Sequence, residues 1–155
     1  METSFLASIH TKVVHFPIAL LTTYSILEII GFLFKKEFLS KCALLILCLG
    51  VITSVIAALT GNQAFSEFTF WNDESRNLLN EHQTYATYLL WSSVIVCALR
   101  IYFTISKKLK SITKYFFVLL AAIIIFLVYQ TGIRGGDLVK KFGVGTDLHE
   151  TVNEK

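Results

Sequence analysis

The 155-residue sequence lacks much of what a soluble domain or a disordered chain would contain. Charged residues make up only 16% of it, and one proline and eight glycines leave little room for linkers or low-complexity tracts. Apolar residues make up 54%, which is too much for an ordinary soluble surface. The composition therefore predicts an integral membrane protein with a single domain, residues 1–155.

The sequence also lacks the usual signals for nucleic-acid binding and for secretion. A net charge of +3 is small, and its local pattern does not form a basic stripe. Glu2 lies where a secretory signal peptide is basic, and the apolar run that follows is too long and has no small-residue cleavage site. We expect no nucleic-acid partner and no cleaved signal peptide.

Cysteine is scarce, and its spacing does not indicate chemistry. Cys42, Cys48 and Cys97 form no C-x-x-C or C-x-x-C-H motif, so the pattern does not favour a zinc knuckle, a redox dithiol or a covalently attached haem. All three lie in apolar runs, where cysteine packs as a small hydrophobe. The sequence likewise shows no nucleophile–base arrangement, phosphate loop or carboxylate pair, so it does not establish an enzyme.

Four apolar runs are long enough to cross a bilayer, which takes about 20 residues each. The connections between the first two runs and between the last two are short, so neighbouring helices should be antiparallel. We predict an all-α, integral membrane four-helix bundle with spans at 13–34, 42–61, 82–106 and 112–133 and a C-terminal tail, 134–155.

Positive charge indicates the orientation, because short cytoplasmic connections are enriched in Lys and Arg. The middle connection, 62–81, has one basic residue, Arg76, and four acidic ones. Most other basic residues flank the two short connections: Lys35, Lys36, Lys41, Arg100, Lys107, Lys108, Lys110 and Lys114. The short connections should therefore face the cytoplasm, and both termini and the middle connection should face outward.

The middle connection is also rich in aromatic residues. Phe65, Phe68, Phe70 and Trp71 precede the polar run that starts at Asn72. Such a mixture is typical of a short segment that lies at the membrane interface. An aromatic loop packed over the end of the bundle is the alternative.

This topology places every histidine on the outer side. His10 and His15 lie at the start of the first span, His82 at the start of the third, and His149 in the tail. On a continuous helix, His10 and His15 would be about 140° apart around the axis and could not hold one small ion together. Pro17 leaves the Val13 carbonyl without its helical donor, which predicts a bend in this region.

Ligands from two helices suit a larger cofactor. His15 opposite His82 can hold a haem iron, with the porphyrin between the helices. We therefore predict a b-type cytochrome-like electron-transfer subunit with one haem b near the outer face. Its axial ligands would be His15 and His82, with His10 as a spare imidazole and Arg134 as the cation that pairs with a propionate.

Small residues recur along one face of the second span, at Gly50, Ser54, Ala57 and Gly61. They permit close approach either by a porphyrin edge or by another helix. The sequence leaves both open.

Glu28 is an acid inside the first span, nearer its cytoplasmic end. An intramembrane carboxylate is a candidate for a proton path. It lies about two turns from Lys35, so a side chain that reaches back to the inner interface is the other interpretation.

A set of motifs carries a family resemblance: Val14-His-Phe-Pro-Ile-Ala-Leu20, Ala57-Ala-Leu-Thr-Gly61, Gly135-Gly-Asp-Leu-Val139 and Phe142-Gly-Val-Gly145. The chain resembles the bacterial four-helix membrane family catalogued as domain of unknown function 2231. The resemblance implies four spans in the bacterial inner membrane. Because members sometimes occur joined to or beside cytochrome c domains, it also implies a membrane-protein or periplasmic cytochrome partner.

The chain departs from the family pattern at two positions. Thr11 follows His10 where the family commonly has proline, and Phe142 stands where it tends to have histidine. If that histidine is a ligand in relatives, this chain lacks a second site or uses His149. We therefore expect one haem.

Two other functions fit the same residues. The absence of a complete catalytic set also suits a cofactor-free structural or assembly subunit of a larger membrane complex. His10, His15 and His82 are also a possible copper or zinc set at the outer face, since imidazole suits both metals.

Overall fold

The computed structural model describes residues 5–69, 71–107 and 111–144, and these residues form helices with no strand. The helices are α1 (Phe5–Val13), α2 (His15–Leu33), α3 (Glu37–Glu67), α4 (Asp73–Ile105) and α5 (Ser111–Phe142). Four helical stretches are long and apolar enough to cross a membrane, with α1 and α2 together supplying the first. The predicted all-α four-helix membrane bundle is confirmed.

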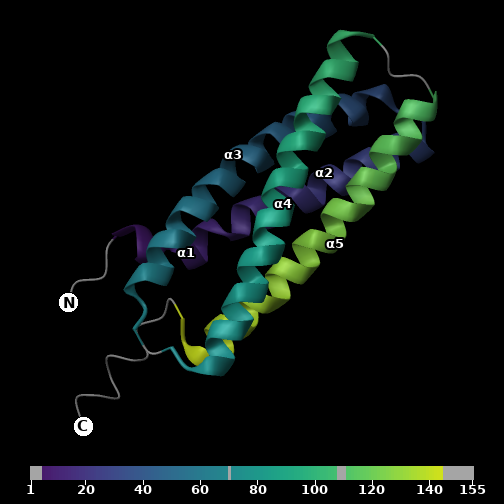
Figure 1. The fold of residues 1–155 in the computed structure, drawn as a ribbon. Coiled ribbons are helices and arrows are strands. Elements are labelled where there is room, and N and C mark those ends of the chain that lie inside the picture. Colours follow the sequence, from purple (N-terminus) through teal and green to yellow (C-terminus); the bar gives the residue numbers. More distant parts are fainter. Residues whose placement is uncertain (1–4, 70, 108–110, 145–155) are drawn as a thin grey trace.

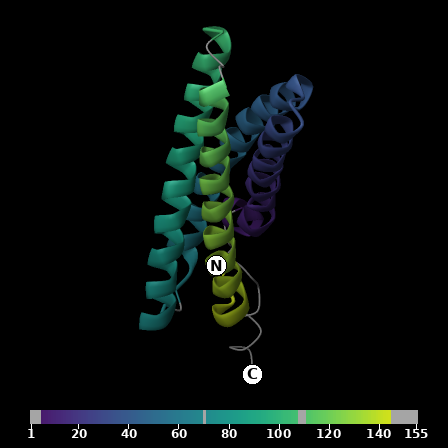
Figure 2. The ribbon, with the colours of Figure 1, turned by 90° about the vertical axis from the view of Figure 1, so that its right-hand side faces the viewer.

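The helices run antiparallel in chain order (Figure 1). α2 packs against α3 and α5, α4 packs against α5 and α3, and α1 lies on α3. The α2–α3 pair is inclined to the α4–α5 pair, as Figure 2 shows. The start of α1, the 68–72 connection and the end of α5 lie at one end of the bundle, called here the histidine end. The turn after α2 and the end of α4 lie at the other, called the lysine end.

The bundle buries a narrow core and turns most of its apolar surface outward. Leu21, Tyr24, Leu47, Phe117 and Ile124 are fully buried where α2, α3 and α5 meet. Large aliphatic and aromatic side chains are exposed along the outer faces of all four spans. Such a surface would aggregate in water, and its helices keep their backbone hydrogen bonds internal, as a bilayer requires.

The first span is broken near its start, as Pro17 predicts. The helix stops at Val13 and resumes at His15. Around the break the Val14 amide donates to the His10 carbonyl over 3.1 Å, and the Ile18 amide donates to the Val14 carbonyl over a long 3.4 Å. Val14 itself keeps helical dihedral angles, φ −60° and ψ −23°, so the interruption is a short irregularity within the membrane-length stretch Ile9–Leu33.

α3 continues to Glu67 and α4 begins at Asp73, so both helices extend into the connection predicted at 62–81. Asn72 fixes that beginning. Its Oδ1 accepts from the Ser75 amide at 2.8 Å, and the Ser75 hydroxyl accepts from the Asn72 amide at 3.0 Å. This reciprocal pair is a capping box.

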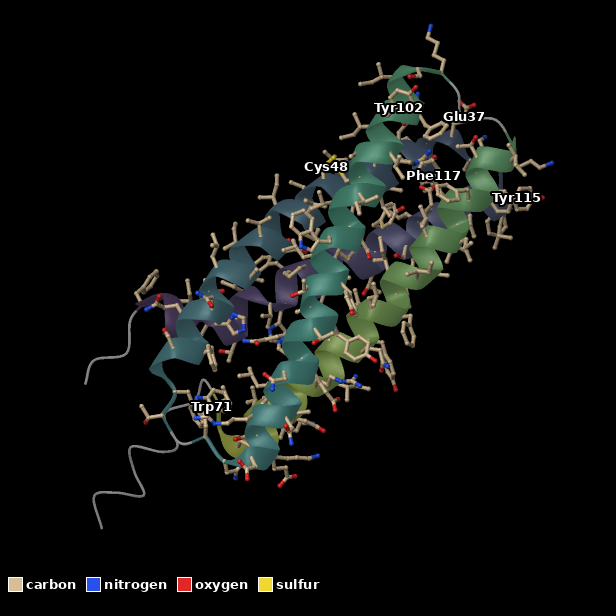
Figure 3. The ribbon with its side chains drawn as sticks, in the orientation of Figure 1. Glu37, Cys48, Trp71, Tyr102, Tyr115 and Phe117 are labelled. Carbon is tan, nitrogen blue, oxygen red and sulfur yellow. The ribbon has the colours of Figure 1, made fainter. Side chains whose placement is uncertain are left out.

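The aromatic residues of the connection pack on one another. The Trp71 ring lies 4.7 Å from that of Phe68 and 5.5 Å from that of Phe65, centroid to centroid. Figure 3 places Trp71 at the histidine end. Phe68 and Trp71 thus pack with Phe65 of α3 at the tip of the bundle, and Phe70 lies outside the described residues.

α5 likewise extends into the tail predicted at 134–155, through Gly135 and Gly136 to Phe142. Gly143 then adopts a positive φ of 66°. Its amide donates to the Val139 carbonyl, and the Val144 amide donates to that of Leu138, a helix ending that favours glycine. His149 lies outside the described residues.

Candidate functional site

Two half-buried histidines from different helices lie toward the histidine end. His10 on α1 and His82 on α4 are both half-buried. Their rings are close enough for the charge of one to act on the other. His15, the first residue of α2, has an exposed side chain. His10 is thus the half-buried histidine of the first span that acts electrostatically on His82.

The tautomer of His10 follows from its partner on α3. Its Nδ1 lies 3.0 Å from the hydroxyl oxygen of Thr60. That hydroxyl lies 3.1 Å from the carbonyls of Ile56 and Ala57, to which it donates its only proton. When the hydroxyl donates to one of these carbonyls, it accepts from His10, and Nδ1 then carries the hydrogen. In the neutral ring Nε2 then keeps its lone pair.

His82 is held in the same way by α5. Its Nδ1 lies 3.1 Å from the backbone carbonyl of Thr131. A carbonyl can only accept, so Nδ1 donates and Nε2 of the neutral ring is again a free base. In both rings a protein oxygen thus holds Nδ1, which leaves Nε2 as the basic nitrogen.

Glycines on the supporting helices make room for both rings. A Cβ added at Gly61 on α3 would lie 2.8 Å from His10 Cε1, and one at Gly135 on α5 would lie 3.0 Å from His82 Cε1. No real Cβ tolerates these contacts without a shift. Part of the small-residue face of α3 therefore seats an imidazole, while Gly50 on the same face admits Leu21 of α2.

Alanine at Gly61 or at Gly135 is expected to displace the imidazole that rests on it. Relative to alanine at Gly132 or Gly136, where an added Cβ meets nothing within 4 Å, the free energy of unfolding should fall by about 1–3 kcal/mol, the usual cost of overpacking. Thermal unfolding in detergent micelles, followed by circular dichroism, measures the difference. Equal stability of all four variants would show that the rings do not rest on these glycines.

Arg134 lies beside His82 and already has partners. Its Nε donates to the Glu81 carboxylate at 2.9 Å, and its Nη1 donates to the Gln130 carbonyl at 3.1 Å. The guanidinium stacks 4.1 Å from the centroid of the Tyr85 ring. It also acts electrostatically on His82. The expected pairing of Arg134 with a propionate stays a prediction.

The copper or zinc set expected from three histidines does not form among the described residues. Within them, no group of three or more His, Cys, Asp or Glu side chains could hold a metal ion.

A second polar cluster lies toward the lysine end. Its residues stand out separately in the sequence, but their contact with one another was not predicted. Glu28 on α2 is 4% exposed and Arg100 on α4 is 1% exposed. Arg100 Nη2 lies 3.1 Å from both Glu28 carboxylate oxygens, and it also donates to the Ser40 hydroxyl on α3. Glu28 is therefore paired inside the bundle and does not reach back to the interface. The charge pattern groups Arg100 with the basic residues beside the short connections, but Arg100 lies inside the third span predicted at 82–106.

The donors of this cluster are incompletely used. Within the described part of the chain, Arg100 Nε and Nη1 and the buried Tyr24 hydroxyl have no hydrogen-bond partner. The guanidinium lies 4.9 Å from the centroid of the Phe117 ring, which shields it on one side. The pair is thus held in a largely apolar setting.

Four membrane-length helices in one antiparallel bundle, with apolar side chains on the outer faces, define a multi-pass integral membrane protein. The chain belongs to the family described as predicted membrane protein, domain of unknown function 2231, whose model matches residues 7–148. The match includes both histidines, both glycines beneath them and the Glu28–Arg100 pair. No curated protein and no solved structure matches the chain.

Proposed function

We propose that this protein is a membrane electron-transfer subunit that binds one b-type haem through His10 and His82. The observation that supports the proposal is the pair of imidazoles from α1 and α4, each with Nδ1 bonded to a protein oxygen. Histidines that bind metals characteristically donate their second N–H to such an oxygen, which fixes the tautomer and raises the basicity of the ligand. His10 replaces His15 as the ligand from the first span.

The supporting residues have distinct tasks in this proposal. Thr60 and the Thr131 carbonyl orient the two rings, and Gly61 and Gly135 allow them to sit close to α3 and α5. Arg134 supplies positive charge beside His82, where an anionic edge of the cofactor would be stabilised. When bound between two imidazoles, the haem iron would take up and release one electron at a time.

We place the histidine end on the periplasmic side of the bacterial inner membrane. Lys35 and Lys36, in the turn after α2, lie at the opposite end of the bundle, and short lysine-rich connections favour the cytoplasm. A periplasmic or membrane cytochrome would then exchange electrons at the histidine end. Exposed Asn80, Gln83, Thr84 and Thr87 on α4, next to His82, suit contact with water or with such a polar partner.

Protein expressed with ample haem and purified in detergent should give a Soret band that shifts on dithionite reduction. A pyridine haemochrome assay should show b-type haem at one per chain. One haem per chain is expected because the proposed site has a single pair of axial imidazoles. If the purified protein is folded and free of haem, the proposal fails, and a cofactor-free structural or assembly subunit becomes the better description.

A further inference from the structure

Two cysteines far apart in the sequence meet inside the bundle. Cys48 on α3 and Cys97 on α4 are both free thiols, and their Sγ atoms are 3.6 Å apart. Figure 3 shows Cys48 on the side of α3 that is next to α4. The spacing in the chain gave no indication of this contact, because the two residues lie on different spans.

The pair is close to the geometry of a disulfide. A disulfide bond needs an Sγ–Sγ distance of about 2.05 Å, so the two sulfur atoms must approach by about 1.5 Å. α3 and α4 already contact each other, and no other side chain needs to pass between the thiols.

Cys48 can be reached from the lipid. It is half-buried, and Leu45, Leu49 and Ile52, on the same face of α3, are exposed. Cys97 lies behind it and is buried. An oxidant dissolved in the bilayer would therefore meet Cys48 first, with Cys97 as the second sulfur.

Polar groups of the Glu28–Arg100 cluster lie near the thiols. Arg100 follows Cys97 by one turn of α4. The Tyr24 hydroxyl interacts electrostatically with Cys97, Glu28 and Arg100, so all four groups share one region of the interior.

We propose that Cys48 and Cys97 form a dithiol–disulfide redox site that is oxidised by a lipid-soluble quinone. The two S–H bonds break and one Sγ–Sγ bond forms, which releases two electrons and two protons. The quinone takes up both electrons and both protons, and its two carbonyl groups become the hydroxyl groups of the quinol. The site lies toward the lysine end and needs no haem, so it stands or falls separately from the proposed electron-transfer function.

The test uses the reduced full-length protein in lipid nanodiscs, without oxygen, treated with a short-chain ubiquinone analogue. After the reaction the protein is denatured and alkylated, and the labelled cysteines are counted by mass spectrometry. The chain has three cysteines, so labelling should fall from three to one, with one quinol formed per chain. Peptide mapping should find the missing pair as a Cys48–Cys97 disulfide.

Cys42 provides the matched control, since it lies on the same helix as Cys48. Cys42→Ser should fall from two labelled cysteines to none, while Cys48→Ser and Cys97→Ser should keep both. The proposal is overturned if quinone leaves all three wild-type thiols free. It is also overturned if wild-type peptides show a disulfide that involves Cys42, a result that does not depend on whether the serine variants fold.

Discussion

Glu28→Leu is expected to lower the free energy of unfolding by about 3–5 kcal/mol, the usual cost of leaving one member of a buried ion pair alone. Arg100 would then hold an unpaired positive charge in the apolar interior, bonded to the Ser40 hydroxyl and facing the Phe117 ring. Denaturant titration of the purified protein in mixed micelles measures the loss. The effect should be visible as a lower yield of folded protein as well.

Two variants separate the ion pair from a general effect of substitution. Glu28→Leu combined with Arg100→Leu should recover most of the lost stability, because two well-packed apolar residues replace two charges. Asp137→Asn breaks the exposed bridge to Lys141, which is 3.0 Å long, and should cost less than about 1 kcal/mol because solvent screens it. If Glu28→Leu alone is as stable as the wild type, the buried pair does not form.

His82→Ala and His10→Ala are each expected to remove the b-type spectrum. Loss of a supporting partner of a metal ligand costs about 10- to 100-fold in affinity, and loss of the ligand itself should cost more. Haem titration followed at the Soret band measures the change. Thr60→Val keeps the shape of the side chain but removes the oxygen that accepts from His10, so it should show the smaller, 10- to 100-fold effect.

His15→Ala is the matched control for the ligand pair. It removes an imidazole only five residues from His10, yet its side chain is exposed, so haem content and affinity should be unchanged. If His15→Ala abolishes the spectrum and His10→Ala does not, the pairing predicted from the sequence is right and the one proposed from the structure is wrong. Circular dichroism of each variant checks that the bundle is intact.

The number of spans and their antiparallel order could be predicted from the sequence, because hydropathy and connection length determine them. The ends of the helices could not. α3 and α4 continue past their apolar stretches into polar residues, where hydropathy has no signal. The Asn72–Ser75 capping pair is a local signal for the start of α4, and hydropathy does not detect it.

The Glu28–Arg100 and Cys48–Cys97 contacts could not be predicted from the sequence, for a different reason. Glu28 and Arg100 lie on different helices, as do Cys48 and Cys97, so only helix packing brings them together. The choice between His10 and His15 depends on the break at Val14. Pro17 predicts an irregularity there, but it does not predict the direction in which the preceding helix leaves.

The length of α4 and its capped start bear on the depth of His82 in the membrane. A helix of 33 residues is about 50 Å long, whereas the hydrocarbon layer is about 30 Å thick. The polar first turns of α4 account for most of the excess, and His82 lies nine residues, or about 14 Å, from its start. The two imidazoles therefore sit close to the level where lipid tails give way to headgroups. A water-soluble protein could come within reach of a group bound there without entering the bilayer.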